Sequence, residues 1–472
     1  MVNIDEFKRN AHELVDWIAD YLTNVDKFPV RSQMNYGEIK KSLPKEAPVN
    51  PEPMDAIFND FREKILPGIT HWQSPKFFAY FPSNSSTPSV LAEFIVAALG
   101  VQGMKWITSP AATELEEVVM EWLRKMINLP EIFSGVIMDT ASVATLCAII
   151  AAREKITRFH SNTNGMESKN LRIYCSGEAH SSIEKAVRIA GLGSKNLKKI
   201  EVDQECRMVP EELRKAILQD IQLGYIPTCV VAAFGTTGTS SLDPVEEIGK
   251  IAKEFKIWLH VDAAFAGTAL ILPEFRKNIR GLELADSFVF NPHKWMFTNF
   301  DCSVFFVRDK EHLQDVFRLV PSYLQTQTNT EANDYSNWGI HLGRRFRALK
   351  LWFVIRNFGL IGIQERLREH LALSEYFEKE IRKSGSFELI VPRNLAITCF
   401  RFKPKGIDDE AELNRLNAEL IEKINSSGRI YISHTIIRGK FTLRFVCAQT
   451  NTQKEHVEEA INTITKFAAE LI

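Results

Sequence analysis

Residues 258–264 read Trp-Leu-His-Val-Asp-Ala-Ala, and residues 287–295 read Ser-Phe-Val-Phe-Asn-Pro-His-Lys-Trp. Each stretch starts with a short, largely apolar run typical of a buried strand and continues into polar residues, with Asp262 in the first and Lys294 in the second. In open α/β sheets, ligands bind at the carboxyl ends of the strands. The two stretches therefore predict strands of a mostly parallel sheet that carry an acid and an amine where such sheets bind ligands.

The region around these stretches, from about residue 86 to 364, alternates short β-rich runs with helical stretches. This alternation is typical of a mostly parallel sheet covered by helices. We predict a large α/β domain over residues 86–364, in which the most clearly marked strands are Arg172–Cys175, Cys229–Phe234, Trp258–Val261 and Ser287–Phe290.

The segments on either side of this domain have other patterns. Residues 1–85 combine a predicted helix over Phe7–Val25 with Pro-rich connections, which indicates an N-terminal helical arm. Residues 365–472 contain apolar runs at Phe387–Val391 and Ala396–Phe402 and a final helix from about Lys454. We therefore predict a small α+β C-terminal domain over residues 365–472.

Composition and charge exclude several classes of function. The 58 Lys and Arg residues nearly balance 59 Asp and Glu, and no basic run marks a nucleic-acid or membrane surface. The N-terminus lacks a secretory signal, and no apolar stretch reaches the ~20 residues that span a bilayer. The seven cysteines are scattered, as expected of reduced core residues, so we expect a soluble cytoplasmic protein. The absence of HExxH and of a strand followed by GxGxxG disfavours a zinc hydrolase and a nicotinamide oxidoreductase, and no metal is expected.

Lys294 and Asp262 each have a structural and a functional interpretation. Lys294 is either a charge in a surface turn or an amine whose pKa is lowered at the strand end, which makes it nucleophilic. Asp262 is either a helix N-cap or ion-pair partner, or a carboxylate that keeps a pyridine nitrogen protonated so that the ring accepts electrons. The two functional interpretations together match the needs of a pyridine cofactor.

Other positions fit the same chemistry. Thr140-Ala141-Ser142 lies between an apolar run and a helix, so it is either a simple N-cap or an anion site for a 5′-phosphate. His180 follows a predicted strand and is either structural or a ring that stacks on the cofactor. Thr237, in the turn Gly235–Gly238, and His293 are possible hydrogen-bond donors to the cofactor; the alternative for the turn is an ordinary loop.

Longer stretches resemble a known family over nearly the whole chain. In this order and spacing they resemble the group II pyridoxal-phosphate decarboxylases, above all the aromatic L-amino-acid decarboxylase family. The matching stretches are His71–Pro75, Phe77–Pro82, Ser109–Glu116, His180–Ser182, Asp262–Ala264, Asn291–Trp295 and Leu342–Arg347.

The resemblance implies a fold and an activity. The implied fold is an aspartate-aminotransferase-like large domain of fold type I, within a homodimer whose N-terminal arms wrap the partner subunit. The implied cofactor is pyridoxal 5′-phosphate on Lys294. The implied reaction is decarboxylation of tryptophan, tyrosine, phenylalanine or dihydroxyphenylalanine to the arylalkylamine and CO2.

The resemblance also implies roles for individual residues. Ala141 and Ser142 would hold the phosphate with Asn291 and His293, while His180 and Ala264 would pack on opposite faces of the cofactor ring. The residues expected to form the pocket for the substrate side chain are Trp72, Tyr80, Phe81, Pro82, Gln102, Met104 and Gly343.

Tyr323 is expected to decide which product forms. Loss of CO2 leaves a carbanion, and a phenol can protonate it. In the family, Phe in place of this Tyr accompanies oxygen-dependent conversion of the amino acid into an aldehyde. Tyr323 therefore favours an amine, and an aromatic aldehyde synthase on the same scaffold is the alternative. The polar stretch Gln325–Asn337 suits a flexible lid.

The sequence departs from the family pattern at several positions. Asp139 stands where a glycine is common, so a negative charge lies near the expected phosphate unless the side chain turns away. Gln102 and Met104 replace apolar or aromatic pocket residues, and Gly339-Ile340-His341 replaces the more common Gln-Ile-Pro. We expect these departures to affect cofactor affinity and substrate preference.

Overall fold

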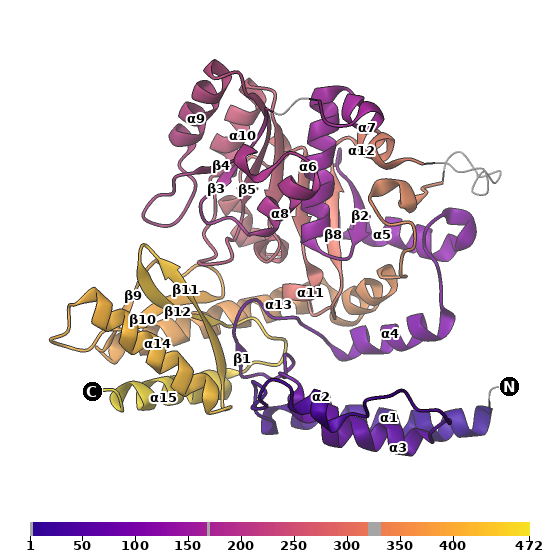
Figure 1. Ribbon diagram of the computed structural model, residues 1–472, viewed down its shortest axis with the longest axis vertical. Coiled ribbons are helices and arrows are strands. Elements are labelled where there is room, and N and C mark those ends of the chain that lie inside the picture. Colours follow the sequence, from indigo (N-terminus) through magenta and orange to yellow (C-terminus); the bar gives the residue numbers. More distant parts are fainter. Residues whose placement is uncertain (1–2, 168–169, 320–331) are drawn as a thin grey trace. The chain divides into compact units, whose positions relative to one another are not determined.

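The computed structural model describes residues 3–167, 170–319 and 332–472 (Figure 1). The chain divides into two compact units, one formed by Ser83–Leu371 and the other by Met1–Pro82 with Ala372–Ile472. The chain passes between the units close to the domain limits predicted near residues 85 and 364. The N-terminal segment clusters with the C-terminal segment in one unit, and its role as an arm around a partner subunit stays a prediction.

The Ser83–Leu371 unit is built on a seven-stranded sheet with the order β2-β8-β7-β6-β5-β3-β4 among the described residues. The strands β4, β3, β5, β6 and β7 are parallel, and β8 runs antiparallel to both β7 and β2. The strand bounds are β2 Ser134–Met138, β3 Leu171–Ser176, β4 Leu197–Ile200, β5 Ile226–Ala233, β6 Trp258–Asp262, β7 Ser287–Phe290 and β8 Ser303–Val307.

Helices cover both faces of this sheet. On one face α6 packs over β5 to β8 with α8 and α12 beside it, and α9 and α10 pack together against β5 (Figure 1). Cys229 and Val231 of β5 belong to the core under α6, and the alternating Val230 and Ala232 are equally buried. The helices of this unit are α4 Thr87–Leu99, α5 Pro110–Met126, α6 Ala141–Thr157, α7 His160–Asn164, α8 Ser182–Ile189, α9 Pro210–Gln222, α10 Val245–Glu254, α11 Pro292–Trp295 and α12 Lys310–Phe317.

The predicted strands of the large domain are confirmed with small shifts at their ends. Trp258–Val261 gains Asp262 as its last residue, and Ser287–Phe290 has the predicted bounds. The run Cys229–Phe234 overlaps the longer strand Ile226–Ala233, which starts three residues earlier and ends one residue before Phe234. The parallel sheet and the helices that cover it confirm the α/β fold class.

The second unit contains a five-stranded sheet with the order β1-β11-β12-β10-β9. Phe377 stacks on Phe445 in its core, with ring centroids 3.7 Å apart. The strands are β1 Phe77–Phe78, β9 Phe387–Leu389, β10 Ile397–Phe402, β11 Tyr431–Ile437 and β12 Lys440–Val446. The helices are α1 Ile4–Asn24, α2 Glu38–Ser42, α3 Met54–Asp60, α14 Glu410–Ser426 and α15 Lys454–Ala469, and α13 Ala348–Lys383 enters from the other unit.

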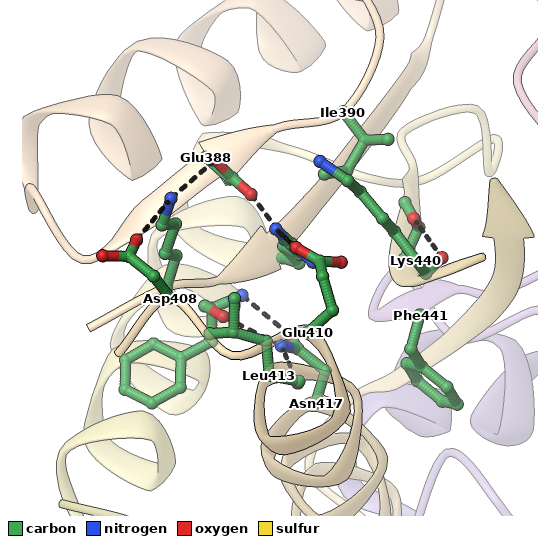
Figure 2. Close-up of polar contacts among 12 residues, drawn as sticks. Glu388, Ile390, Asp408, Glu410, Leu413, Asn417, Lys440 and Phe441 are labelled. Carbon is green, nitrogen blue, oxygen red and sulfur yellow. Dashed lines mark hydrogen bonds and ion pairs between the residues drawn. The ribbon is translucent and has the colours of Figure 1, made fainter. Parts of the chain in front are cut away.

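An ionic network around the buried Arg401 fixes the edge of this smaller sheet. Arg401 of β10 is 1% exposed and binds Glu388 of β9 and Glu410 of α14 (Figure 2). Its two hydrogen bonds to Glu410 measure 2.8 and 2.9 Å. Asn417 of α14 accepts from the amide of Phe402 at 2.7 Å and donates to its carbonyl at 2.8 Å (Figure 2). Helix α14 is therefore tied to β10 by both charges and backbone contacts.

Helix α1 has no buried residue within this chain, although Trp17 stacks on Tyr21. Its exposed apolar side chains include Ile4, Phe7 and Val15. No helix of the described residues is long and apolar enough to cross a membrane.

Candidate active site

Asp262 and Lys294 lie at the ends of adjacent strands. Asp262 is the last residue of β6 and pairs in register with Val289 of β7, while Lys294 lies in α11 directly after β7. Asp262 is 8% exposed, and its Oδ1 accepts a hydrogen bond from Ala264 N at 3.0 Å. Burial lowers the pKa of Lys294 to about 8, and the negative charge of Asp262 opposes that shift. The acid and the amine predicted from the sequence therefore interact electrostatically.

His180, in the loop between β3 and α8, joins this group. Its Nδ1 accepts a hydrogen bond from Ser182 N at 3.1 Å and lies 2.7 Å from Ser182 Oγ. In the neutral ring the proton therefore resides on Nε2. Loss of solvation lowers the pKa of His180, Asp262 opposes this shift, and Lys294 adds to it. Groups at the ends of three strands thus share one electrostatic environment.

His293 presents a donor in a defined tautomer. Its Nδ1 accepts a hydrogen bond from Cys302 N at 3.0 Å, so the ring proton resides on Nε2. Burial lowers the pKa of His293 to about 3, which keeps the ring neutral at physiological pH. Asn291 is also buried, and its Oδ1 accepts from Ser303 Oγ at 2.6 Å, which leaves its amide nitrogen as the donor.

The N-terminus of α6 offers backbone amides to an anion. Thr140 is the N-cap residue and makes no side-chain cap hydrogen bond. Among the described residues, the amides of Ala141 and Ser142 have no hydrogen-bond acceptor. Because the positive end of the helix dipole lies at the same place, this turn can hold a phosphate group.

Asp139, directly before this turn, has both carboxylate oxygens engaged. Its Oδ1 accepts a hydrogen bond from Thr140 N at 2.6 Å, and its Oδ2 lies 3.4 Å from His341 Nε2. Two of the departures from the family pattern, at Asp139 and His341, therefore contact each other.

The turn after β5 places Thr237 at its exposed tip. Gly235 has φ 99°, and a Cβ at this position would lie 2.6 Å from the Cβ of Ala266. The turn therefore requires glycine at its first position. Ala264, two residues after the end of β6, is half-buried, and its carbonyl accepts from Asn291 N at 2.9 Å.

Three residues expected in the substrate pocket lie on adjoining segments of the Ser83–Leu371 unit. A Cβ on Gly343 would lie 3.4 Å from Gln102 Oε1. The following Arg344 accepts at its carbonyl from Gly103 N at 2.9 Å, and Met104 O accepts from Ser336 N at 2.9 Å. The segments that carry Gln102, Met104 and Gly343 are therefore held together by backbone hydrogen bonds.

The other predicted pocket residues belong to the other unit. Trp72 stacks on Tyr80 with ring centroids 5.9 Å apart, and the Tyr80 hydroxyl lies 3.1 Å from that of Tyr431. Phe81 and Pro82 follow directly and are buried. The joint pocket predicted from these residues and the other three stays a prediction.

Tyr323 and residues 325–331 of the expected lid lie outside the described residues. The structure does describe residues 332–337 of the expected lid, and contacts hold them in place. Tyr335 is 3% exposed, and Asp334 forms an ion pair with Lys105 at 3.2 Å. The expectation of a flexible lid extending to Asn337 is therefore wrong for its last residues, because Tyr335 and Trp338 pack into the core.

Sequence reasoning missed a buried polar chain beneath the site. Trp258 Nε1 donates to Ser287 Oγ at 2.9 Å, and Ser287 Oγ lies 2.9 Å from His260 Nδ1. His260 Nε2 lies 3.2 Å from Thr145 Oγ1 of α6. Burial lowers the pKa of His260 to about 4, so the ring is neutral. The position of His260 in the sequence could have indicated this polar chain. His260 lies two residues before Asp262, and side chains two residues apart in a strand point to the same face.

Arg347, the last residue of the stretch Leu342–Arg347, has a supporting role that the sequence did not indicate. Its guanidinium binds both carboxylate oxygens of Asp301, at 3.0 and 3.1 Å. Asp301 precedes Cys302, whose amide binds His293. Arg347 therefore supports the segment that fixes the tautomer of His293.

Comparison with known proteins gives matches that agree with one another and cover most or nearly all of the chain. The family model described as the pyridoxal-dependent decarboxylase conserved domain matches residues 37–403. Tyrosine decarboxylase 4 of Petroselinum crispum is 43% identical over 483 residues, covering 99% of this chain and 94% of the relative. A phenylacetaldehyde synthase of Arabidopsis thaliana is also 43% identical, over 479 residues that cover 99% of this chain and 97% of the relative.

A solved structure is also similar over nearly the full length of this chain. The crystal structure of Oryza sativa TDC with PLP and tryptamine superposes with a TM-score of 0.96 at 36% identity, covering 99% of each chain.

Proposed function

The chain belongs to the pyridoxal-dependent decarboxylase family, and we propose that it converts an aromatic L-amino acid into the corresponding arylalkylamine and CO2. The observation that carries the proposal is the position of Asp262 and Lys294 at the ends of the adjacent strands β6 and β7, where burial lowers the pKa of Lys294 to about 8 and the charge of Asp262 opposes that shift. Named relatives decarboxylate tyrosine, and the rice structure holds tryptamine. Both molecules belong to the proposed substrate and product classes.

The cofactor is pyridoxal 5′-phosphate, and the residues present fit it. The open amides of Ala141 and Ser142 and the Nε2 proton of His293 are donors suited to the phosphate. Asp262 is a carboxylate suited to a protonated pyridine nitrogen. When bound, this cofactor supplies an aldehyde that links to amines and a ring that accepts electrons from the substrate's α-carbon.

Lys294 would bind the cofactor and release it to the substrate amine. An amine must be unprotonated to act as a nucleophile. With a pKa of about 8 instead of 10.5, the unprotonated fraction at neutral pH rises about 300-fold.

His180 would orient the substrate, and Tyr323 would supply a proton to it. His180, with its ring proton on Nε2, would lie on the cofactor ring and donate toward the substrate carboxylate, which sets the bond that breaks. Tyr323 would deliver the proton to the α-carbon after CO2 leaves. A Tyr at this position, by family resemblance, favours the amine over the aldehyde that the Arabidopsis thaliana relative is named for.

The active protein would be a homodimer in the cytoplasm. Helix α1 buries none of its residues within the chain, and α4 exposes Leu91, Phe94, Ile95 and Leu99. Apolar side chains in such numbers on two helices indicate an interface. All seven cysteines are buried and free, which suits a reducing compartment.

The test is a product analysis with the cofactor-loaded protein. Tryptophan, tyrosine, phenylalanine and dihydroxyphenylalanine are supplied separately, and CO2, amine, aldehyde and peroxide are measured. The proposal predicts equal amounts of amine and CO2 without peroxide, and it predicts aldehyde and peroxide from the Tyr323→Phe variant. Aldehyde and peroxide from the wild-type protein would replace the proposal with the aldehyde synthase alternative.

A further inference from the structure

Two side chains that the family pattern does not predict meet beside the proposed phosphate site. Asp139 follows β2, and His341 follows the 3₁₀ helix Tyr335–Trp338. Although 202 positions separate them, His341 Nε2 lies 3.4 Å from Asp139 Oδ2. The two side chains are 42% and 24% exposed, so the contact lies at the surface of the unit.

The other oxygen of Asp139 points to the helix that follows. Oδ1 accepts from Thr140 N at 2.6 Å and lies 3.4 Å from the Thr140 hydroxyl. The carboxylate of Asp139 is thus held two residues before Ala141, the first of the two residues with open amides. A carboxylate and a phosphate at one helix N-terminus compete for the same positive potential and repel each other.

Arg347 does not replace His341 as the partner of this carboxylate. It interacts electrostatically with Asp139, but its guanidinium forms its hydrogen bonds with Asp301 at 3.0 and 3.1 Å. The His341 imidazole is therefore the cation-capable group in direct contact with Asp139.

We propose that His341 is a positioning residue for the cofactor phosphate: it holds the Asp139 carboxylate to one side of the first turn of α6 and offsets its charge. The proposal deepens the proposed function and rests on it, because it concerns the phosphate of the same cofactor. Without His341, the carboxylate oxygen Oδ2 loses its contact with the imidazole Nε2, and the carboxylate charge acts on the phosphate without that neighbour.

The test is a double-mutant cycle read out as cofactor affinity. Apoprotein of the wild type, His341→Ala, Asp139→Asn and the double variant is titrated with pyridoxal phosphate and, separately, with pyridoxal, which lacks the phosphate. His341→Ala should weaken pyridoxal phosphate binding about three- to tenfold. Pyridoxal binding should not change, and in the Asp139→Asn background the loss of His341 should have no effect.

Asp139→Asn alone should tighten pyridoxal phosphate binding relative to the wild type. If His341→Ala does not fold, this variant still tests whether the Asp139 charge weakens binding of the phosphate. The matched control is His160→Ala, which removes a histidine that lies 3.0 Å from a carboxylate oxygen of Glu167. This control should bind both ligands like the wild type.

Three results would overturn the proposal: unchanged pyridoxal phosphate affinity in His341→Ala, an equal loss for pyridoxal, or the same loss in the Asp139→Asn background. These outcomes are separate from failure of the proposed function. If the proposed function fails, the loaded wild-type protein releases no CO2, and this result does not depend on how the dissociation constants of the variants compare with that of the wild type.

Discussion

At the scale of single residues, the proposed chemistry depends on a lysine whose positive charge is costly in its folded position. Lys294 is half-buried in α11, and burial lowers its pKa to about 8 against the opposing field of Asp262. The cost of holding this charge in the folded protein is the same free energy that makes the amine reactive.

Because the charged form of Lys294 is disfavoured in the folded protein, the free energy of unfolding of the apoprotein should depend on pH. Between pH 8 and 10.5 the unfolded chain holds a proton on Lys294 that the folded chain has released, so the free energy of unfolding rises with pH in this window. A Lys294→Met variant lacks this contribution. Denaturant unfolding of the apoprotein should show Lys294→Met more stable than the wild type below pH 8, by at most about 3 kcal/mol, with the difference vanishing toward pH 10.5.

The control is Lys250→Met, which removes an exposed lysine that pairs with Glu246 at 2.7 Å. It should show no such gain at low pH. A difference between Lys294→Met and the wild type that stays constant across the window would mean that the Lys294 amine keeps its ordinary pKa.

Asp262→Asn tests the charge at the end of β6 separately from its geometry. Asparagine keeps an oxygen that can accept from Ala264 N, but it cannot keep a pyridine nitrogen protonated. The expected result is a fall in kcat of about 100- to 1000-fold, with the cofactor still bound. Steady-state kinetics together with the absorbance of bound cofactor measure both. Activity within a few-fold of wild type would assign Asp262 a structural role only.

What could be predicted from the sequence is the placement of residues next to an interpretable strand end, such as Asp262, Lys294 and His180, whereas their roles stay predictions. The contact of Asp139 with His341 could not be predicted, because nothing local to either residue specifies a partner 202 positions away. The hydrogen bond from Cys302 N that fixes the tautomer of His293 is a second example, since it depends on how β8 returns beside α11.

At the scale of elements, α13 shows how one residue divides a helix. Gly359 has φ 64° and ψ 170° inside Ala348–Lys383, so two helices meet there. An ideal Cβ at Gly359 would have no atom within 4 Å, whereas one at Gly362 would lie 3.7 Å from Phe358 Cβ in ordinary contact. The two glycines differ in backbone conformation and not in available space.

The pair allows a matched test of that difference. Gly359→Ala should lower the free energy of unfolding by about 1–2 kcal/mol, because an L-residue is strained at positive φ. Gly362→Ala should raise it by about 0.5 kcal/mol through helix propensity. Chemical denaturation measures both, and equal effects of the two substitutions would show that the helix does not break at Gly359.

The parallel strands β3, β5, β6 and β7 were predictable because they are largely apolar and buried, as in Val230–Ala232. The parallel strand β4 was not predicted, because Leu197–Ile200 includes two lysines and is only partly buried. β8 was not predicted, although Ser303–Val307 is equally apolar, because a strand antiparallel to both neighbours is not marked by the alternation of strands and helices. β1 has only Phe77 and Phe78, which is too short for a periodic signal.

At the scale of the whole molecule, the net charge of -1 gives no long-range field to hold two copies apart or together. Association would therefore depend on apolar contacts such as those offered by α1. Which residues cluster into each unit was not predictable from the sequence, because Met1–Pro82 joins Ala372–Ile472 through contacts between distant residues, such as the pairing of β1 with β11.

The proposed homodimer gives a direct test. Phe7 of α1 is 62% exposed in the single chain, so Phe7→Glu should leave the subunit fold intact and shift the mass in solution toward the monomer. Light scattering measures the mass, and circular dichroism checks the fold. The control is Leu223→Glu, at a leucine that is 73% exposed just after α9 and should not affect association. A wild-type protein that is monomeric at the concentrations of the activity assay would contradict the dimer proposal.

The central claim is that Lys294, at the end of β7 and beside Asp262, is the amine that binds pyridoxal phosphate. The most direct measurement is borohydride reduction of the loaded protein, followed by proteolysis and mass spectrometry of the peptides. The account predicts one pyridoxyl-phosphate group per chain, on the peptide that contains Lys294, and none in Lys294→Ala. A modification on another lysine, with Lys294 unmodified, would contradict it.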